Sequence, residues 1–130
     1  MTKKVMLVED DSTMITLLSK LLQFEGFIVV PLKNDENLDT ILECVRKEKP
    51  EIILLDVYLR DISGFDLLKR LRTDLTTKDI RILMSSGMDL EEQCINKGAD
   101  NFIMKPYMPE DLLSSIWQTL EETNNKTESG

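Results

Sequence analysis

Acidic side chains follow two of the apolar runs in this sequence. Glu9 and Asp10 come directly after KVMLV (4–8), and Asp56 comes directly after IILL (52–55). Carboxylates that gather at one place repel one another and require a cation. The chain contains no histidine, which excludes histidine-based zinc sites and catalysis by Ser-His-Asp or Cys-His groups. The candidate chemistry is therefore carboxylate chemistry around an oxygen-ligated ion, and Mg²⁺ is the ion that such ligands favour.

Short apolar runs that are too short for helices recur along the chain, bounded by Gly, Pro or charged residues. They predict five strands, at 4–8, 27–30, 52–55, 82–85 and 101–104. Apolar residues at helical spacing separate these runs and predict five helices. The first helix follows a cap at Asp11 or Ser12 and stops at Gly26, the second lies between Asn34 or Asp35 and Lys49-Pro50, the third follows Gly64, the fourth covers 90–95, and the fifth covers 112–120.

Three of the predicted strands are continuous apolar runs, which is typical of a parallel sheet covered by helices on both faces. The sequence therefore predicts a doubly wound three-layer α/β sandwich of five βα units. One domain is expected over residues 1–121. Residues 122–130 lack apolar anchors and are expected to be a frayed polar tail or the stub of a linker.

Chemistry-bearing residues follow four of the predicted strands. Glu9 and Asp10 follow the first strand, Asp56 the third, Ser86 the fourth and Lys105 the fifth. Because ligands of such sheets bind beyond the carboxyl ends of the strands, these side chains are expected to converge at one edge. Mg²⁺ leaves coordination positions open for an oxygen of a phosphoryl group, so the site is suited to phosphate.

Composition restricts the partners and the location. The formal net charge is -8 and the pI is near 4.6, which disfavours direct binding to nucleic acid or to anionic membranes. No apolar stretch is long enough to span a membrane, and the amino terminus does not have the pattern of a signal peptide. A cytoplasmic location is expected, with Cys44 and Cys94 as reduced thiols.

Four segments together resemble the response-regulator receiver domain of two-component signalling: LVEDDSTM, IILLDVYLRDISGFDLL, ILMSSG and GADNFIMKPY. The resemblance covers residues 4 to about 121. It implies a flavodoxin-like fold with the parallel strand order 2-1-3-4-5. It also implies that Asp56 is the phosphoacceptor, that Glu9 and Asp10 hold Mg²⁺ together with Asp56, and that the backbone carbonyl of Tyr58 is a further metal ligand.

The same resemblance assigns roles beside the acceptor. Ser86 stands where the family has Thr or Ser, and its hydroxyl would meet a phosphoryl oxygen, with Ser85 as the alternative. Lys105 would meet another phosphoryl oxygen, aimed inward by a cis peptide bond to Pro106. Phe102 occupies the position of the switch aromatic and would turn inward when phosphate draws in the serine, although it is equally read as a core aromatic.

The function implied is phosphorelay signalling. A histidine kinase or a histidine phosphotransfer protein would donate the phosphoryl group, and the receiver would catalyse its own phosphorylation and dephosphorylation without being an enzyme of metabolism. Its target would be a protein that binds the phosphorylated form, or an output domain joined covalently. The chain departs from the family pattern at Arg60, where proline is common, and in the segment 86–98, which is about one helical turn shorter.

Two other functions are compatible with parts of the pattern. A Mg²⁺-dependent phosphatase that acts on small molecules through an aspartyl-phosphate would use the same acids, but such enzymes usually carry a second acid two residues after the nucleophile, where this chain has Tyr58. A protein-binding module with receiver shape and no phosphorylation is the third hypothesis. Whether the chain acts alone or belongs to a longer regulator stays open.

Overall fold

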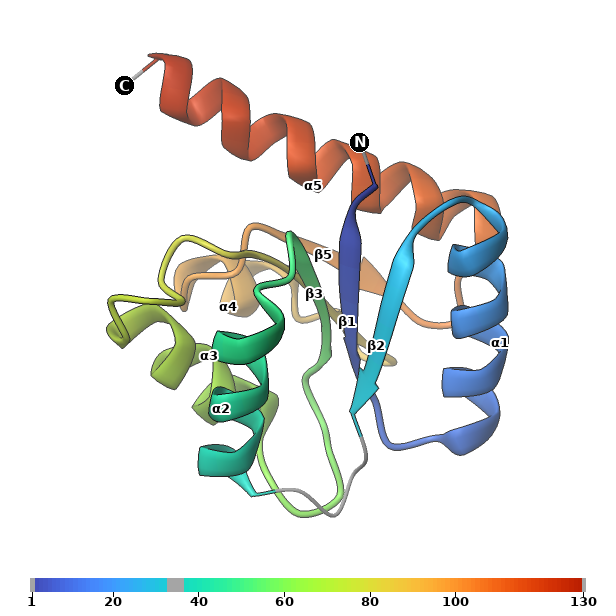
Figure 1. Ribbon diagram of the computed structural model, residues 1–130, viewed down its shortest axis with the longest axis horizontal. Coiled ribbons are helices and arrows are strands. Elements are labelled where there is room, and N and C mark those ends of the chain that lie inside the picture. The colour runs from blue at the N-terminus through green and yellow to red at the C-terminus, as the bar shows by residue number, and fades with distance from the viewer. Residues whose placement is uncertain (1, 33–36, 130) are drawn as a thin grey trace.

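Strands and helices alternate along the chain in the computed structural model, which describes residues 2–32 and 37–129, with 122–129 described by their backbone alone (Figure 1). The strands are β1 (Lys4–Val8), β2 (Ile28–Leu32), β3 (Ile52–Asp56), β4 (Arg81–Ser86) and β5 (Asn101–Met104). The helices are α1 (Ser12–Phe24), α2 (Leu38–Glu48), α3 (Gly64–Thr73), α4 (Glu91–Asn96) and α5 (Pro109–Ser129). The predicted succession of βα units is confirmed.

The five strands form one parallel sheet in the order β2-β1-β3-β4-β5, as the resemblance implied. Leu55 of β3 pairs with Val8 of β1 on one side and with Met84 of β4 on the other. Ser86 at the end of β4 pairs with Met104 at the end of β5. The register therefore aligns the carboxyl ends of β1, β3, β4 and β5 along one edge of the sheet.

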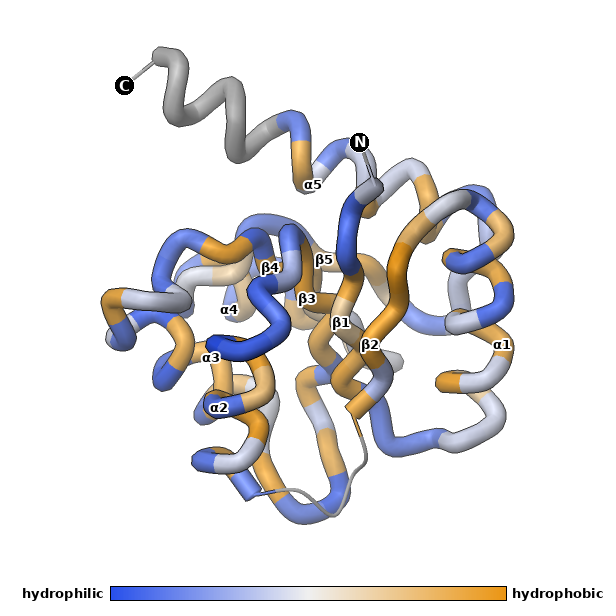
Figure 2. Tube along the Cα trace, viewed as in Figure 1, coloured by the Kyte–Doolittle hydropathy of each residue, from blue (hydrophilic) through white to orange (hydrophobic). Residues whose placement is uncertain are grey.

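Successive residues of the central strands point to opposite faces, and each face carries its own helices. Strand residues such as Met6 and Ile53 pack in one buried cluster with α2, α3 and α4. Their neighbours Val5 and Ile52 pack in a second cluster with α1 and α5. Figure 1 shows the two groups of helices on either side of the sheet, and Figure 2 shows hydrophobic residues concentrated in the strands between them. The predicted three-layer sandwich is confirmed.

Polar caps fix the starts of the first two helices. The Asp11 carboxylate accepts the backbone N–H groups of Thr13 and Met14 at 2.9 and 3.2 Å, so Asp11 is the cap of α1. The cap of α2 is Asn37, whose side chain accepts the N–H of Thr40 at 2.8 Å. The prediction of a cap at 34 or 35 is therefore wrong, and Asn34 and Asp35 lie outside the described residues.

Two element ends differ from the sequence predictions. β2 continues past Val30 through Pro31 to Leu32, because it is an edge strand and a proline there costs no hydrogen bond to a second neighbour. The backbone of α5 is helical to Ser129, whereas the composition of 122–130 had indicated a frayed tail. The division into a domain at 1–121 and a tail or linker stub stays a prediction.

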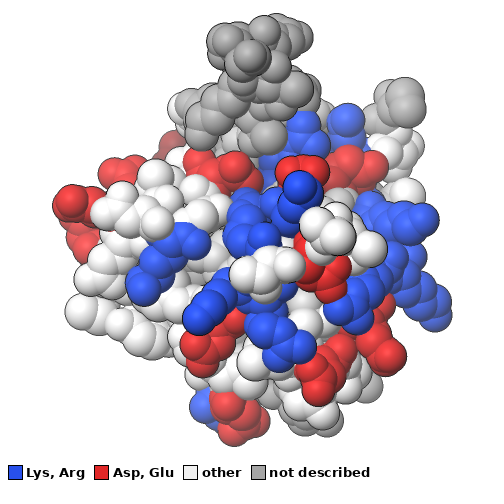
Figure 3. All heavy atoms as spheres, turned by 90° about the vertical axis from the view of Figure 1, so that its left-hand side faces the viewer, with Lys and Arg blue, Asp and Glu red and all other residues white. Residues whose placement is uncertain are grey.

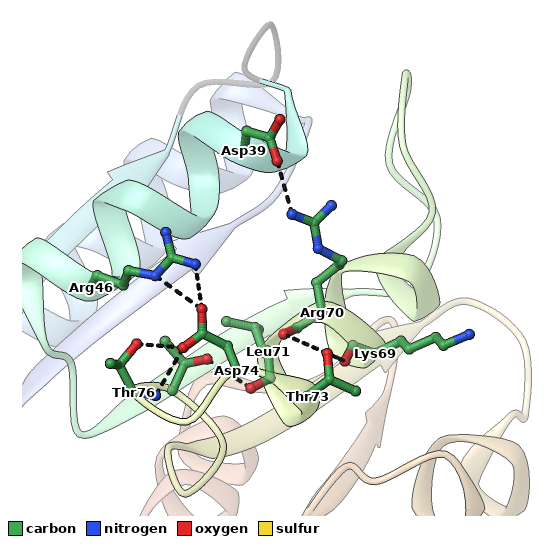
Figure 4. Close-up of polar contacts among 9 residues, drawn as sticks. Asp39, Arg46, Lys69, Arg70, Leu71, Thr73, Asp74 and Thr76 are labelled. Atoms are coloured by element: carbon green, nitrogen blue, oxygen red, sulfur yellow. Dashed lines mark hydrogen bonds and ion pairs between the residues drawn. The ribbon is translucent and has the colours of Figure 1, made fainter.

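Ion pairs connect α2 with α3 on the surface (Figure 4). Arg46 of α2 contacts the carboxylate of Asp74, which follows α3. Arg70 of α3 donates to Asp39 of α2 at 2.8 Å. These exposed pairs link the two helices but add little to stability, because solvent screens them.

Candidate functional site

Three charged side chains meet at the carboxyl edge of the sheet. The ammonium of Lys105, which follows β5, donates to Glu9 Oε1 at 2.8 Å and to Asp56 Oδ2 at 2.9 Å. Glu9 follows β1 and Asp56 ends β3, and both are buried, with 7% and 8% of their surface exposed. We call these three residues the carboxylate rim. The rim joins distant segments of the chain, since Glu9 and Lys105 are 96 residues apart in the sequence.

Backbone hydrogen bonds between neighbouring strand ends position the rim. The N–H of Val57, directly after Asp56, donates to the carbonyl of Ser85 at 2.9 Å. The N–H of Lys105 donates to the carbonyl of Ser86 at 2.8 Å. The peptide bond between Lys105 and Pro106 is cis, as the resemblance implied. Backbone hydrogen bonds between the strands thus extend to the residues beside the rim and fix the backbone positions of Asp56 and Lys105.

Gly64 at the start of α3 is a positioning residue that the sequence analysis treated only as a helix boundary. Its N–H donates to the carbonyl of Val57 at 2.8 Å. A Cβ atom on Gly64 would lie 2.2 Å from the backbone oxygen of Asp56, which is closer than any two such atoms can approach. Only glycine therefore lets α3 pack against the backbone of Asp56. The sequence signal was the Gly in SGFDLL, eight residues after Asp56.

Burial and charge compete at the rim. Burial raises the pKa of Asp56 above its ordinary value of 3.8 and outweighs the hydrogen bond and the positive charge of Lys105 and a backbone hydrogen bond from Tyr58, which lower it. The negative charge of Glu9 adds to the increase. Burial by itself lowers the pKa of Lys105, but hydrogen bonds to Glu9 and Asp56 dominate, and its pKa rises above 10.5. Lys105 therefore stays an ammonium between two acids.

The Mg²⁺ ligands expected from the sequence, Glu9, Asp10 and Asp56, stay a prediction. Among residues 2–32 and 37–129, no group of three or more His, Cys, Asp or Glu residues lies close enough to hold a metal ion. Both oxygens of Glu9 are engaged, since Oε1 contacts Lys105 and Oε2 accepts the N–H groups of Asp10 and Asp11 at 2.9 and 3.2 Å. The ammonium of Lys105 connects Glu9 and Asp56.

The donors at the rim nevertheless fit Mg²⁺ chemically. Mg²⁺ typically takes one or two carboxylates and completes its shell with carbonyl or water oxygens, so a cluster of three acids is not needed. Glu9 and Asp56 lie on either side of one ammonium, and Asp10 adds a third acid beside Glu9. The Lys105 ammonium is one positive charge between two buried carboxylates, so these three groups together carry an excess of negative charge. A divalent cation would neutralise it.

Ser86 and Ser85 are both buried, with 1% and 2% of their surface exposed. Ser86 ends β4, as predicted, and its hydroxyl accepts the N–H of Met88 at 3.0 Å. Ser85 lies inside the strand, paired with Asp56 across the sheet. The choice of Ser86 as the hydroxyl that meets phosphate stays a prediction.

Phe102 already lies inside the protein. Its surface is 9% exposed, and it belongs to the cluster that packs under α2, α3 and α4. The expected inward turn of Phe102 from an outer position therefore has no counterpart in this structure, because the inner position is already filled. A role as switch remains a prediction.

Tyr107 is a further residue near the rim to which the sequence analysis gave no role. Among the described residues its buried hydroxyl has no hydrogen-bond partner. Burial raises its pKa to about 12, and the charges of Lys105, Glu9 and Asp56 also act on it. Its phenol lines a hollow beside Met14 and Leu18 of α1. Only its place directly after Lys105-Pro106 could have indicated this location.

Comparison with known families identifies the type of domain. The family model of the response regulator receiver domain matches residues 5–117. The chain belongs to this family. Receiver domains are phosphorylation-based signalling modules of two-component systems, and the family gives no support to the alternative of a phosphatase for small molecules. In the described part of this receiver, no helix is long and apolar enough to cross a membrane.

Relatives and solved structures agree with this assignment. The receiver is 29% identical over 124 residues to the phosphate regulon transcriptional regulatory protein PhoB of Pseudomonas aeruginosa, covering 93% of this chain and 53% of PhoB. It is 29% identical over 117 residues to the alkaline phosphatase synthesis transcriptional regulatory protein PhoP of Bacillus subtilis, covering 89% of this chain and 48% of PhoP. The chain thus spans about half the length of these curated relatives. The crystal structure of a CheY-like response regulator receiver domain protein from Methanospirillum hungatei is 28% identical, with a TM-score of 0.82 over 97% of this chain and 99% of that one.

Proposed function

We propose that this receiver accepts a phosphoryl group on the carboxylate of Asp56 in a Mg²⁺-dependent reaction and that this modification changes its contacts with other proteins. The donor is a phosphohistidine on a histidine kinase or on a histidine phosphotransfer protein. The receiver assists its own phosphorylation and dephosphorylation, and it turns over no small-molecule substrate. A protein target, or an output domain in a longer chain, reads the change.

The contact of Lys105 with both Glu9 and Asp56 is the observation that supports this proposal most. It brings an acceptor carboxylate and a cation to within 2.9 Å of each other at a buried edge of the sheet. Charge on a transferring phosphoryl group is spread over its outer oxygens, so fixed positive charge beside an in-line nucleophile stabilises the transition state. Asp56 needs no general base, because an ionised carboxylate has no proton to lose.

The transfer itself exchanges one bond of phosphorus for another. An oxygen of Asp56 forms the new P–O bond while the P–N bond to the donor imidazole breaks, and the imidazole keeps the electron pair and takes a proton from solvent. The ammonium of Lys105 turns from Glu9 and Asp56 toward the incoming phosphoryl oxygens. The hydroxyl of Ser86 donates to another phosphoryl oxygen. It can do so without losing its present hydrogen bond, because in that bond it accepts the N–H of Met88.

Mg²⁺ would be held by the carboxylates of Glu9, Asp10 and Asp56 and by the backbone carbonyl of Tyr58. When bound, it supplies positive charge that neutralises the excess of carboxylates and the approaching phosphoryl group. Glu9 is suited to this exchange because Lys105 can leave Glu9 Oε1 for a phosphoryl oxygen. A cytoplasmic location follows from the same proposal, because such donors are cytoplasmic in two-component systems.

The test is the intact mass of the protein after incubation with phosphoramidate, a small donor with a P–N bond, in the presence of Mg²⁺. Wild type is expected to gain one phosphoryl group, and Asp56→Asn is expected to gain none. Asp61→Asn is the matched control, because it removes an exposed carboxylate of the neighbouring loop. Chelation of Mg²⁺ with EDTA is expected to suppress the gain in wild type.

Two results would contradict the proposal. Wild type that stays unmodified under all these conditions would favour the protein-binding module without phosphorylation. Steady release of inorganic phosphate from small phosphate esters, lost in Asp56→Asn, would instead favour the phosphatase.

A further inference from the structure

A hollow of about 470 Å³ lies between α3 and the end of α4, away from the carboxylate rim. Five of its lining residues share one side of α3, at the spacing of successive helical turns, and the sixth follows α4. They are Phe65, Asp66, Lys69, Arg72, Thr73 and Lys97. Three of the six are basic, in a chain whose net charge is -8.

Two of these basic side chains are not neutralised by the protein. In the described part of the chain, no carboxylate lies within ion-pair distance of the Lys69 or Lys97 ammonium. The Lys97 ammonium lies 5.3 Å from the centre of the Phe65 ring, a cation–π contact that leaves its hydrogen-bond donors available. Asp66 is the one acid of the lining, so the hollow keeps an excess of positive charge.

Arg72 makes the wall of the hollow rigid. Its guanidinium donates to the carbonyls of Gly98 at 2.8 Å and Ile80 at 2.6 Å and to the carboxylate of Asp100 at 2.9 Å. A fourth hydrogen bond reaches the carbonyl of Lys78 at 2.8 Å. These bonds tie α3 to the segments on both sides of β4. A ligand would therefore meet a preformed site and would lose little affinity to ordering of the wall.

The short α4 helps to expose this hollow. α4 ends at Asn96, and Lys97 caps its carboxyl end. The side chain of Lys97 then extends over Phe65 of α3 instead of continuing along a helix. The shortened segment 86–98, noted in the sequence as a departure from the family pattern, thus coincides with the basic hollow.

We propose that this hollow binds a short acidic peptide segment of a partner protein. Carboxylates of the segment would pair with Lys69 and Lys97, and an apolar side chain beside them would pack on the half-buried ring of Phe65. The volume falls within the range of sites that hold small ligands or a few side chains. None of the lining residues belongs to the carboxylate rim, so we expect binding at this surface to be independent of phosphorylation of Asp56.

The charge of the surroundings favours a short acidic segment over nucleic acid. Figure 3 shows Lys and Arg side chains on the face of α2–α4, with Asp and Glu side chains interspersed among them. A nucleic acid would extend its phosphates past the hollow onto these acids and onto the rest of an acidic protein. A short peptide can place its carboxylates in the hollow alone. Electrostatic complementarity of this local kind gives specificity.

The probe is a short fluorescein-labelled peptide that is rich in Glu and has a central Phe, with a control peptide in which Gln replaces every Glu. Fluorescence anisotropy is expected to show saturable, salt-sensitive binding of the Glu peptide to wild type and weaker binding of the Gln peptide. Charge reversal in Lys69→Glu/Lys97→Glu is expected to weaken binding by about tenfold or more. The pair Lys69→Arg/Lys97→Arg is expected to keep it.

The matched control is Lys20→Glu/Lys47→Glu, which changes the net charge equally at exposed lysines of α1 and α2. This control and Asp56→Asn are expected to bind the Glu peptide as wild type does, and circular dichroism checks that all variants are folded. The proposal would be overturned if Lys69→Glu/Lys97→Glu and the control Lys20→Glu/Lys47→Glu weakened binding equally, or if the Glu peptide did not bind wild type. Tighter binding of a single-stranded oligonucleotide than of the Glu peptide would also overturn it.

Discussion

The carboxylate rim and the Arg72 cluster place a cation among acceptors in opposite ways. Arg72 meets three carbonyls and one carboxylate, that of Asp100, so one positive charge faces one negative charge and four donors find acceptors. Lys105 meets two buried carboxylates, those of Glu9 and Asp56. The first arrangement is balanced, and the second is short of positive charge.

This difference separates a structural site from a reactive one. A balanced cluster gains nothing from another ion, so its contribution is to hold α3 to the loops around β4. An unbalanced cluster is held by the fold at a cost, and a cation that arrives there relieves that cost. Imbalance of charge at a buried edge is thus the physical feature that distinguishes the carboxylate rim, which we propose as the reactive site.

The largest effect is expected at the balanced cluster. Arg72→Met should lower the free energy of unfolding by about 3 kcal/mol, because it leaves the half-buried Asp100 carboxylate and the three carbonyls without their donor. Urea denaturation measures this change. Arg70→Met is the control, since Arg70 pairs with Asp39 at an exposed site and should cost less than about 1 kcal/mol. Equal costs for the two variants would mean that the balanced contacts of Arg72 have no special importance.

The next prediction separates access of water from charge at the rim. Tyr58 and Met88 follow Asp56 and Ser86 by two residues and are 60% and 57% exposed, so they are placed to hinder water that attacks the phosphoryl group. Tyr58→Asn/Met88→Glu should speed loss of phosphate by roughly tenfold, less than a fully positioned proton acceptor supplies. The decay of the phosphorylated mass with time measures the rate. An unchanged rate would mean that these side chains do not limit access.

The fold was predictable because each of its signals is local. Apolar runs such as IILL, and stops such as Gly26, mark elements without any knowledge of their neighbours. The wrong element boundaries arose where contacts with other parts of the fold determine the local structure. Pro31 is tolerated because β2 lies at the sheet edge, and Asn37 caps α2 because its side chain reaches the N–H of Thr40.

The meeting of Glu9, Asp56 and Lys105 was also predictable, because strand ends of a parallel sheet share one edge. Its details were not. Which oxygen of Glu9 turns to Lys105 and which turns to the backbone N–H groups depends on side-chain rotamers. The close approach of Gly64 to the backbone of Asp56 depends on the packing of α3, which no short sequence pattern encodes.

A smaller effect, of opposite sign to that of Arg72, is expected at the rim. The pKa of Asp56 is raised by burial, so the ionised carboxylate destabilises the folded protein at neutral pH, and this cost is relieved as the pH falls. Asp56→Asn should therefore increase the free energy of unfolding slightly. Urea denaturation at neutral pH tests the sign, with Asp61→Asn as the control that should leave stability unchanged. A loss of stability in Asp56→Asn would show that its bond to Lys105 outweighs burial.

The smallest effect concerns Asp74, an acid in a balanced but exposed contact. Hydrogen bonds from Thr76 and then from Arg46 lower its pKa from 3.8 to about 2. A lowered pKa means that the ionised form stabilises the folded state above pH 3.8 and that this contribution disappears as the pH falls through about 2. Asp74→Asn should thus be slightly less stable than wild type at neutral pH, and this difference should vanish in strong acid. Asp56→Asn should instead be more stable than wild type at neutral pH, and its advantage should decrease as the pH falls. Denaturation curves recorded across this pH range distinguish the two, and a difference for Asp74→Asn that stays constant with pH would show that its charge contributes nothing.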